Sequence, residues 1–179
     1  MGTGGREMRW RVTAVSMMGL AVAGLVMVLM LAALPARQTV RAMADNNERK
    51  SVEQFNQRWI AACQKMDRPT TVAMWAEDGT DLIQGLEPMV GKAKIAAWLS
   101  DLEKQMPGAK MVYCTVDWQD IQIHGDVAYE WGINRQKVEF PPPQKAFEGA
   151  GKILLILKRE KGEWKIAVES WNSLPGNGE

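Results

Sequence analysis

The chain has 179 residues, of which 46% are hydrophobic and 24% charged, a composition that suits one folded domain and excludes a largely disordered protein. Five of its 22 Lys and Arg residues and one of its 21 Asp and Glu residues precede Asp45, so 17 cations and 20 anions follow, a net charge of −3. A mildly acidic domain with no basic stripe lacks the electrostatic footprint of a nucleic-acid-binding protein, and we expect no nucleic-acid partner.

An apolar run extends from Val12 to Leu34 near the N-terminus. As a helix rising ~1.5 Å per residue it would cross the ~30 Å hydrocarbon core of a bilayer, which predicts a membrane anchor. The pattern Ala42-Met43-Ala44 is typical of a signal-peptide cleavage site and leaves a cleaved signal open. Both interpretations predict an N-terminal signal or anchor segment over residues 1–44. They place a domain over residues 45–179 on the extracytoplasmic side of the membrane, which is the periplasm in a bacterium. If cleavage follows Ala44, the domain is secreted.

Three helices are expected before any long strand. Apolar residues at spacings of three and four predict the first one, at Val52, Phe55, Trp59, Ala62, Cys63 and Met66. Thr70 or Thr71 is expected to cap a short second helix that runs through Trp75. The third helix follows Gly91 and ends at Pro107-Gly108. Between the second and third helices we expect a turn, a brief extended piece and a loop, at Glu77-Asp78-Gly79, Thr80 to Gln84 and Leu86 to Val90.

The second half of the domain has the pattern of strands. Met111 to Ile123 and Val127 to Phe140 predict one hairpin, and Gly151 to Arg159 and Glu163 to Ser173 predict another. Helices followed by an antiparallel meander predict the α+β class, in which a cone-shaped curved antiparallel sheet packs against the three helices. A strongly curved sheet leaves a cavity between the layers.

The two cysteines, Cys63 and Cys114, fall on a predicted helix and a predicted strand. An exported domain permits a disulfide, but the pairing needs a geometry that sequence does not supply, and we interpret the pair as two buried thiols. The chain shows no metal-ligand spacing, no Gly-rich phosphate loop and no nucleophile elbow. We therefore expect no metal site and no cofactor.

Several short phrases occur in an order and spacing that resemble the SnoaL-like and ketosteroid-isomerase-like families of the nuclear transport factor 2-like superfamily. They are Arg58-Trp59-Ile60-Ala61-Ala62, Trp75-Ala76-Glu77-Asp78-Gly79, Gly91-Lys92-Ala93-Lys94-Ile95, Gly125-Asp126-Val127-Ala128-Tyr129, and Trp164-Lys165-Ile166 leading to Trp171-Asn172. The resemblance covers roughly Val52 to Asn172. It implies a cone-shaped α+β fold with a pocket at its wide end, commonly dimeric through the outer sheet face. It implies no single chemistry, because this superfamily hosts several enzyme classes and pure binding proteins.

The steroid-isomerase version of the family requires a tyrosine on the first helix and a carboxylate base in the first short strand. Trp59 takes the place of that tyrosine. The base position falls near Leu82 or Ile83, and Asp81 lies one or two residues out of register. Since a one-residue slip in a strand turns a side chain to the opposite face, this form of proton transfer is disfavoured.

Aromatic residues are numerous in the domain and suit a pocket for an apolar or ring-shaped ligand. The expected ligand-binding residues are Trp59, Trp75, Trp118, Tyr129 and Trp131, with the amide of Asn172 at the rim. Ordinary core packing is the alternative for each ring.

The candidate catalytic groups are Glu130, Glu169 and Asp81. A carboxylate that faces a closed cavity would have a raised pKa useful for acid–base chemistry, but the residues alone favour outward, solvated positions for the two glutamates. The only histidine, His124, has the neighbours of a solvated turn residue, and Asp78 is interpreted as structural.

Three functions remain open from the sequence. The first is a small-molecule-binding domain with an aromatic, largely apolar pocket. The second is a pocket enzyme, an isomerase or hydrolase that uses Glu130, Glu169 or Asp81. The third is a homodimeric protein-interaction module.

Overall fold

The structure, a computed structural model, describes residues 45–175. The chain divides into two compact units, Met1–Asn47 and Glu48–Glu179, and the second unit carries every strand discussed below. The predicted anchor or signal over Val12 to Leu34 lies outside the described residues. Among residues 45–175, no helix has the length and apolar character needed to cross a membrane.

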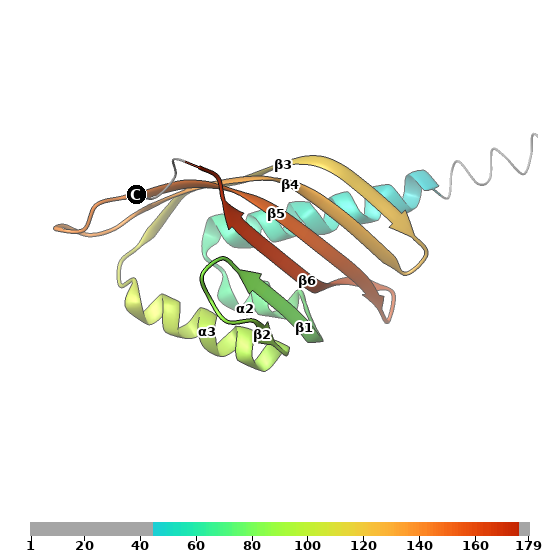
Figure 1. Ribbon diagram of the computed structural model, residues 1–179, viewed down its shortest axis with the longest axis horizontal. Helices are drawn as coiled ribbons and strands as arrows, with labels where there is room; N and C mark the ends of the chain where they lie inside the picture. The colour runs from blue at the N-terminus through green and yellow to red at the C-terminus, as the bar shows by residue number, and fades with distance from the viewer. Residues whose placement is uncertain (1–44, 176–179) are drawn as a thin grey trace, which may run out of the picture. The chain divides into compact units, whose positions relative to one another are not determined.

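Residues 45–175 contain three helices, and the first and third follow the predicted apolar spacing (Figure 1). The first covers residues 45–65, α2 is Arg68–Ala73 and α3 is Lys92–Gln105. The cap of α2 differs from the expectation, because the Asp67 side chain accepts a hydrogen bond from the Thr70 N–H at 3.1 Å. Asp67 therefore occupies the N-cap position expected for Thr70 or Thr71, and the helix ends before Trp75.

A six-stranded sheet forms the other layer, with strand order β2-β1-β6-β5-β4-β3. The strands are β1 (Trp75–Ile83), β2 (Met89–Val90), β3 (Lys110–His124), β4 (Val127–Glu139), β5 (Phe147–Glu160) and β6 (Glu163–Ser173). Both predicted hairpins, β3–β4 and β5–β6, are confirmed. The expectation of a purely antiparallel sheet is wrong, because β1 pairs with β6 in parallel. That pairing joins segments about 90 residues apart, and local sequence patterns carry no information about it.

Strand β1 corrects the expected short helix and turn around Trp75. The segment Glu77-Asp78-Gly79 lies within the strand, where the register against β6 shifts between Trp75 and Thr80. Such a shift is a bulge, which absorbs residues of turn-like composition without ending the strand. A Cβ at Gly79 would lie 2.8 Å from the Trp75 ring, so only glycine fits there. The loop expected over Leu86 to Val90 ends in β2, where Met89 pairs with Asp81.

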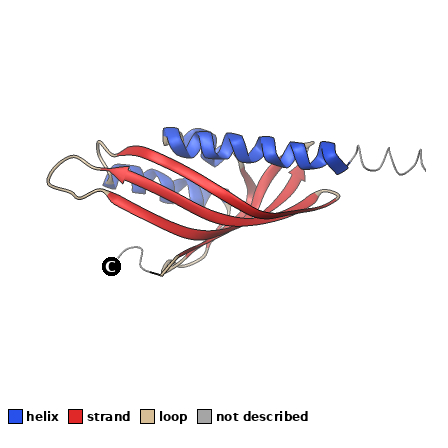
Figure 2. Cartoon of the chain, turned by 90° about the horizontal axis from the view of Figure 1, so that it is seen from above, coloured by secondary structure: helices blue, strands red, loops and turns tan. Residues whose placement is uncertain are grey.

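The helices cover one face of the curved sheet, and the long first helix lies along the strands (Figure 2). The core between the two layers is mostly aliphatic and aromatic. Its fully enclosed members are Val52, Phe55, Ile95, Ile153, Leu155, Leu157 and Ile166. The first helix, α3, β5 and β6 thus meet in one interior.

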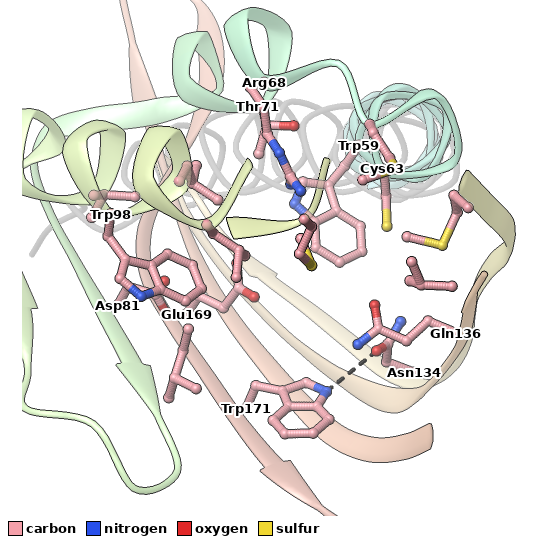
Figure 3. A pocket seen from close by; sticks show the side chains of 18 of the residues that line it. Trp59, Cys63, Arg68, Thr71, Asp81, Trp98, Asn134, Gln136, Glu169 and Trp171 are labelled. Atoms are coloured by element: carbon pink, nitrogen blue, oxygen red, sulfur yellow. Dashed lines mark hydrogen bonds between the residues drawn. The ribbon is translucent and has the colours of Figure 1, made fainter. Parts of the chain in front are cut away.

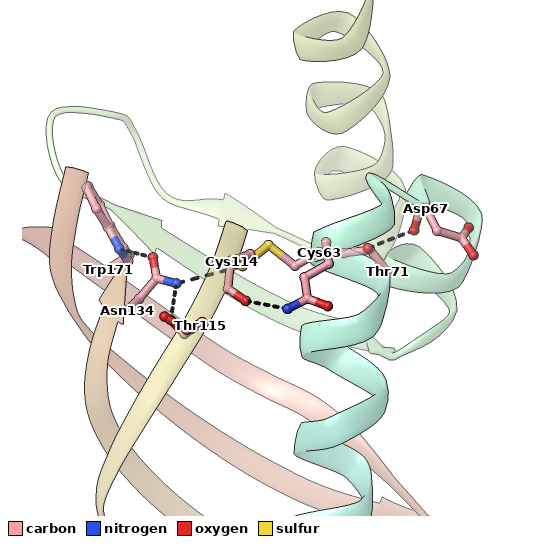
Figure 4. Close-up of a disulfide and its surroundings, with 8 residues drawn as sticks. Cys63, Asp67, Thr71, Cys114, Thr115, Asn134 and Trp171 are labelled. Atoms are coloured by element: carbon pink, nitrogen blue, oxygen red, sulfur yellow. Dashed lines mark hydrogen bonds between the residues drawn. A yellow bond between two sulfur atoms is a disulfide. The ribbon is translucent and has the colours of Figure 1, made fainter. Parts of the chain in front are cut away.

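A disulfide between Cys63 and Cys114 ties the first helix to β3 (Figure 4). The interpretation of the cysteines as two buried thiols is therefore wrong. The helix crosses β3 closely enough to bring the two Cα atoms to 6.1 Å, within the range a disulfide requires. At the same junction the Gln64 Nε2 donates a hydrogen bond to the Cys114 carbonyl at 3.2 Å. Periodicity placed both cysteines on their elements but contained no information on the distance between them.

Candidate ligand-binding cavity

A cavity of about 560 Å³ lies between the helices and the inner face of the sheet, a size typical of small-molecule sites. Four tryptophan rings contribute to its wall, Trp59, Trp75, Trp98 and Trp171. Aliphatic and further aromatic side chains complete it, among them Ile83, Ile95, Leu99, Leu102, Ile153 and Phe140. The disulfided Cys63 also lines the cavity, so the covalent link borders the site.

A small number of polar side chains enter this apolar space (Figure 3). Asp81 and Glu169 come from β1 and β6, and Arg68 comes from α2. Asn134 and Gln136 come from β4. Apolar walls with a few convergent polar groups are the usual composition of a site that binds and orients a small molecule. Among residues 45–175, no group of three or more His, Cys, Asp or Glu side chains is arranged to hold a metal ion.

Asp81 and Glu169 form a carboxyl pair at one wall of the cavity. They are directly opposite each other in the parallel β1–β6 ladder, which puts both side chains on the same face of the sheet. Asp81 is only 4% exposed, and its Oδ1 has no hydrogen-bond partner in the described part of the chain. The sequence favoured a solvated Glu169 and an out-of-register Asp81, and the structure corrects both. The bulge in β1 sets the register that directs Asp81 inward and leaves Leu82 outward.

The electrostatics of this pair favour one shared proton. Burial raises the pKa of Asp81 above its usual range, although a hydrogen bond from the Leu82 backbone opposes the shift. Burial also raises the pKa of Glu169, and the negative charge of Asp81 raises it further. Two neighbouring carboxyl groups in a desolvated wall cannot readily ionise together, so they titrate as a unit. The pair can therefore accept or donate a proton near neutral pH.

Trp171 is held at the cavity wall from two sides. Its Nε1 donates a hydrogen bond to Asn134 Oδ1 at 3.2 Å, while Asn134 Nδ2 donates to the Thr115 carbonyl at 3.1 Å (Figure 4). Behind the ring, a Cβ at Gly151 would lie 2.4 Å from the indole, so the ring packs on a glycine backbone. A ring fixed in this way loses little conformational entropy when a ligand packs against it.

Glu130, the remaining carboxyl candidate, does not line the cavity. Glu130 is a fully buried residue of β4, and its Oε2 accepts a hydrogen bond from Nδ2 of Asn56 on the first helix at 2.7 Å. Burial raises the pKa of Glu130 to about 7, and the hydrogen bond from Asn56 opposes this shift only partly. The solvated position that the sequence favoured is wrong, because the alternation of β4 turns Ala128 and Glu130 toward the helices.

The same alternation decides where the predicted ligand-binding residues lie. Trp59 and Trp75 line the cavity as expected, whereas Trp118, Tyr129, Trp131 and Asn172 lie outside it. With Glu130 directed inward, Tyr129 and Trp131 face outward and are 41% and 42% exposed. Asn172 is exposed on the strand that turns Trp171 inward, and Trp118 packs at the edge of the core.

Sequence reasoning also missed members of the site. Trp98 lies three residues after Ile95 and four before Leu102 on the apolar stripe of α3, so helical spacing contained the signal. Trp171 needed the face of β6 to be known. Arg68, between Asp67 and Pro69, has the appearance of a solvated helix-end residue and gave no signal at all.

The helices-then-strands order, the curved sheet and the cavity between the two layers define a nuclear transport factor 2-like α+β fold. The chain matches the SnoaL-like domain over residues 44–168 and belongs to that family. No curated protein matches it.

Solved structures with the same fold are distant in sequence. A conserved protein from Planctomyces limnophilus has 21% identity and a TM-score of 0.63, covering 72% of this chain and 99% of its own. A ketosteroid isomerase-like protein from Erwinia carotovora has 16% identity and a TM-score of 0.61, covering 70% and 95%. A nuclear transport factor 2-like protein with a cystatin-like fold from Novosphingobium aromaticivorans has 15% identity and a TM-score of 0.62, covering 77% and 89%. These likenesses establish the fold.

Proposed function

We propose that this domain binds a small, largely apolar molecule in the cavity between the helices and the sheet. The proposal rests on one observation: the side chains of Trp59, Trp75, Trp98 and Trp171 line a cavity of about 560 Å³. Apolar surface transferred from water into such a space contributes roughly 25 cal/mol per Å² to binding. The hydrogen bond that fixes Trp171 and the disulfide at Cys63 hold parts of this wall in place before a ligand arrives.

Fluorescence of phenylnaphthylamine, an uncharged probe that brightens in apolar surroundings, tests this proposal. Leu102 lines the cavity from α3, and in Leu102→Trp the larger indole side chain fills part of the cavity. We expect the wild-type chain to bind the probe and Leu102→Trp to bind it at least about tenfold more weakly. Val90→Trp is the matched control, because Val90 is 63% exposed and lies outside the cavity. Equal binding by all three proteins would contradict the proposal.

A second function, acid–base catalysis on the bound molecule, is favoured by the Asp81–Glu169 pair. A carboxylate with a raised pKa can remove a proton from a carbon next to a carbonyl, and the neighbouring carboxyl can hold or return it. This is the isomerase type of chemistry. Among the three carboxyl candidates, only Asp81 and Glu169 have the position that it requires, because Glu130 lies away from the cavity.

Deuterium exchange into beta-tetralone, a ring ketone with acidic C–H groups, tests the catalytic role. We expect the wild-type chain to accelerate the exchange in D2O, as followed by proton NMR, and Asp81→Asn to abolish the acceleration. Glu130→Gln changes a buried carboxyl outside the cavity and should leave it intact. Equal rates of deuterium exchange with and without the protein would contradict acid–base catalysis on ring ketones.

We also propose that the domain lies on the extracytoplasmic side, anchored through Val12 to Leu34 or released after Ala44. The Cys63–Cys114 disulfide supports the proposal, because disulfides persist mainly in oxidising compartments. Alkylation of intact cells with a thiol-reactive maleimide should leave both cysteines unmodified until a reductant is added. Modification without reductant would contradict the proposed location.

A homodimer through the outer sheet face is a further proposal. Tyr129 pairs with Ile156 and Trp131 with Leu154 in the β4–β5 ladder, and these four residues define the outer patch. Tyr129, Trp131 and Leu154 are each more than a third exposed. Clustered exposed rings on a sheet face are typical of a protein–protein interface.

A further inference from the structure

Arg68 is the one Lys or Arg side chain among the described residues that lines the cavity. It is the first residue of α2, which follows the cap at Asp67 and contains Pro69 in its first turn. Figure 3 shows its side chain directed from the helix layer into the space that Asp81 and Glu169 enter from the sheet. The cavity therefore carries opposite charges on two of its walls.

The guanidinium of Arg68 makes no hydrogen bond or ion pair with any residue in 45–175, and its Nε is buried without a partner. Arg49 and Arg159, by contrast, form ion pairs, Arg49 with Glu53 and Arg159 with Glu48 and Asp126. Burial lowers the pKa of Arg68, and the negative charge of Glu103 on α3 opposes the shift. Arginine stays protonated at neutral pH, so this is a partly desolvated cation with unused donors.

An unpaired, partly buried cation is costly, and an anion placed against it recovers that cost. The opposite wall has the reverse preference. Asp81 and Glu169 already compete for one proton, and an anionic group beside them would raise the electrostatic cost further. An acidic head group is thus favoured at Arg68 and disfavoured at β1–β6, while the tryptophan rings accept the apolar body.

We propose that the cavity selects amphipathic monoanions, in which an apolar ring or chain carries one carboxylate or sulfonate group that Arg68 binds. This inference rests on the proposed binding function and names its ligand class. The head group points toward α2, and the opposite end of the ligand meets the Asp81–Glu169 pair. Any carbonyl or hydroxyl at that end lies within the reach of the pair.

Two probes that differ in one group test the inference on the purified full-length chain. Anilinonaphthalene sulfonate has the ring system of phenylnaphthylamine plus a sulfonate. We expect the wild-type chain to bind the sulfonate about tenfold or more tightly, the usual size of one charge-assisted contact. Arg68→Gln should abolish that preference, so that the two probes bind with similar affinity.

Arg135→Gln is the matched control, because Arg135 is an exposed arginine of β4 outside the cavity. It should keep the full preference. Arg68→Lys, which retains a cation, should keep part of it and decides the question if Arg68→Gln fails to fold by circular dichroism.

The outcomes separate this inference from the binding function. Equal wild-type affinity for the two probes overturns the ligand class but leaves the apolar site standing. The ligand class is also overturned if Arg68→Gln keeps the preference for the sulfonate. It is likewise overturned if Arg135→Gln loses this preference, because the sulfonate would then be bound on the outer face of the sheet. Failure of both probes to bind overturns the ligand class and the proposed function together.

Discussion

Replacing Glu130 with glutamine should stabilise the domain in a strongly pH-dependent way. Burial raises the pKa of Glu130 from 4.5 to about 7. Because the folded state holds its proton more tightly than the unfolded state, the contribution to stability is present below pH 4.5 and is lost as the pH rises to about 7. At about 1.4 kcal/mol per pKa unit, the loss is about 3 kcal/mol.

The local hydrogen bonding agrees in sign with this expectation. Glu130 Oε1 and Asn56 Oδ1 are buried acceptors with no donor in the described part of the chain. A proton on Glu130 supplies a donor at this place, and ionisation removes it. The amide of glutamine supplies a donor at every pH.

Urea denaturation of the wild-type chain and Glu130→Gln between pH 4.5 and 8.5, followed by tryptophan fluorescence, measures the effect. The difference in unfolding free energy should move by about 3 kcal/mol in favour of Glu130→Gln as the pH rises. Asp117→Asn is the control, because Asp117 is exposed on β3. A difference that does not change with pH would refute the reasoning that burial keeps Glu130 protonated.

Three further predictions follow from the disulfide, the carboxyl pair and the outer patch. Cys63→Ala with Cys114→Ala should lower the unfolding free energy by about 4 kcal/mol in chemical denaturation, because the bond closes a loop with a sequence separation of 51; no loss would show that the link constrains the unfolded chain little. Asp81→Asn should lower the pKa of Glu169 toward its usual range in an NMR titration, since the negative charge that raises it is gone; an unchanged or higher pKa would mean that the two groups do not interact. Trp131→Glu should convert a dimer to a monomer in sedimentation velocity, whereas Thr115→Glu, at an exposed position of β3, should not.

Sequence patterns predicted the elements that depend on local order. The first and third helices have a continuous apolar stripe, and the two hairpins have short polar turns between β-branched runs, so period alone determined them. The family resemblance then placed these elements in a known order. Trp59 and Trp75 were found for the same reason, since they belong to phrases that carry the resemblance.

What the sequence did not predict depends on contacts between distant segments. The inward direction of Glu169 and the outward direction of Trp131 both follow from which face of a strand meets the helices, and period-two alternation leaves that choice open. The inward direction of Asp81 also needs the bulge in β1. The disulfide and the unpaired state of Arg68 are properties of three-dimensional distances, which no local pattern contains.

The central claim, that the cavity receives an apolar molecule, is tested most directly by the indole N–H signals of the tryptophans in an NMR titration with phenylnaphthylamine. Trp59 and Trp171 line the cavity, and Trp131 lies on the outer face. We predict that the Trp59 and Trp171 signals shift together with saturation, while the Trp131 signal stays in place. Shifts confined to Trp131, or no shifts at all, would contradict the claim.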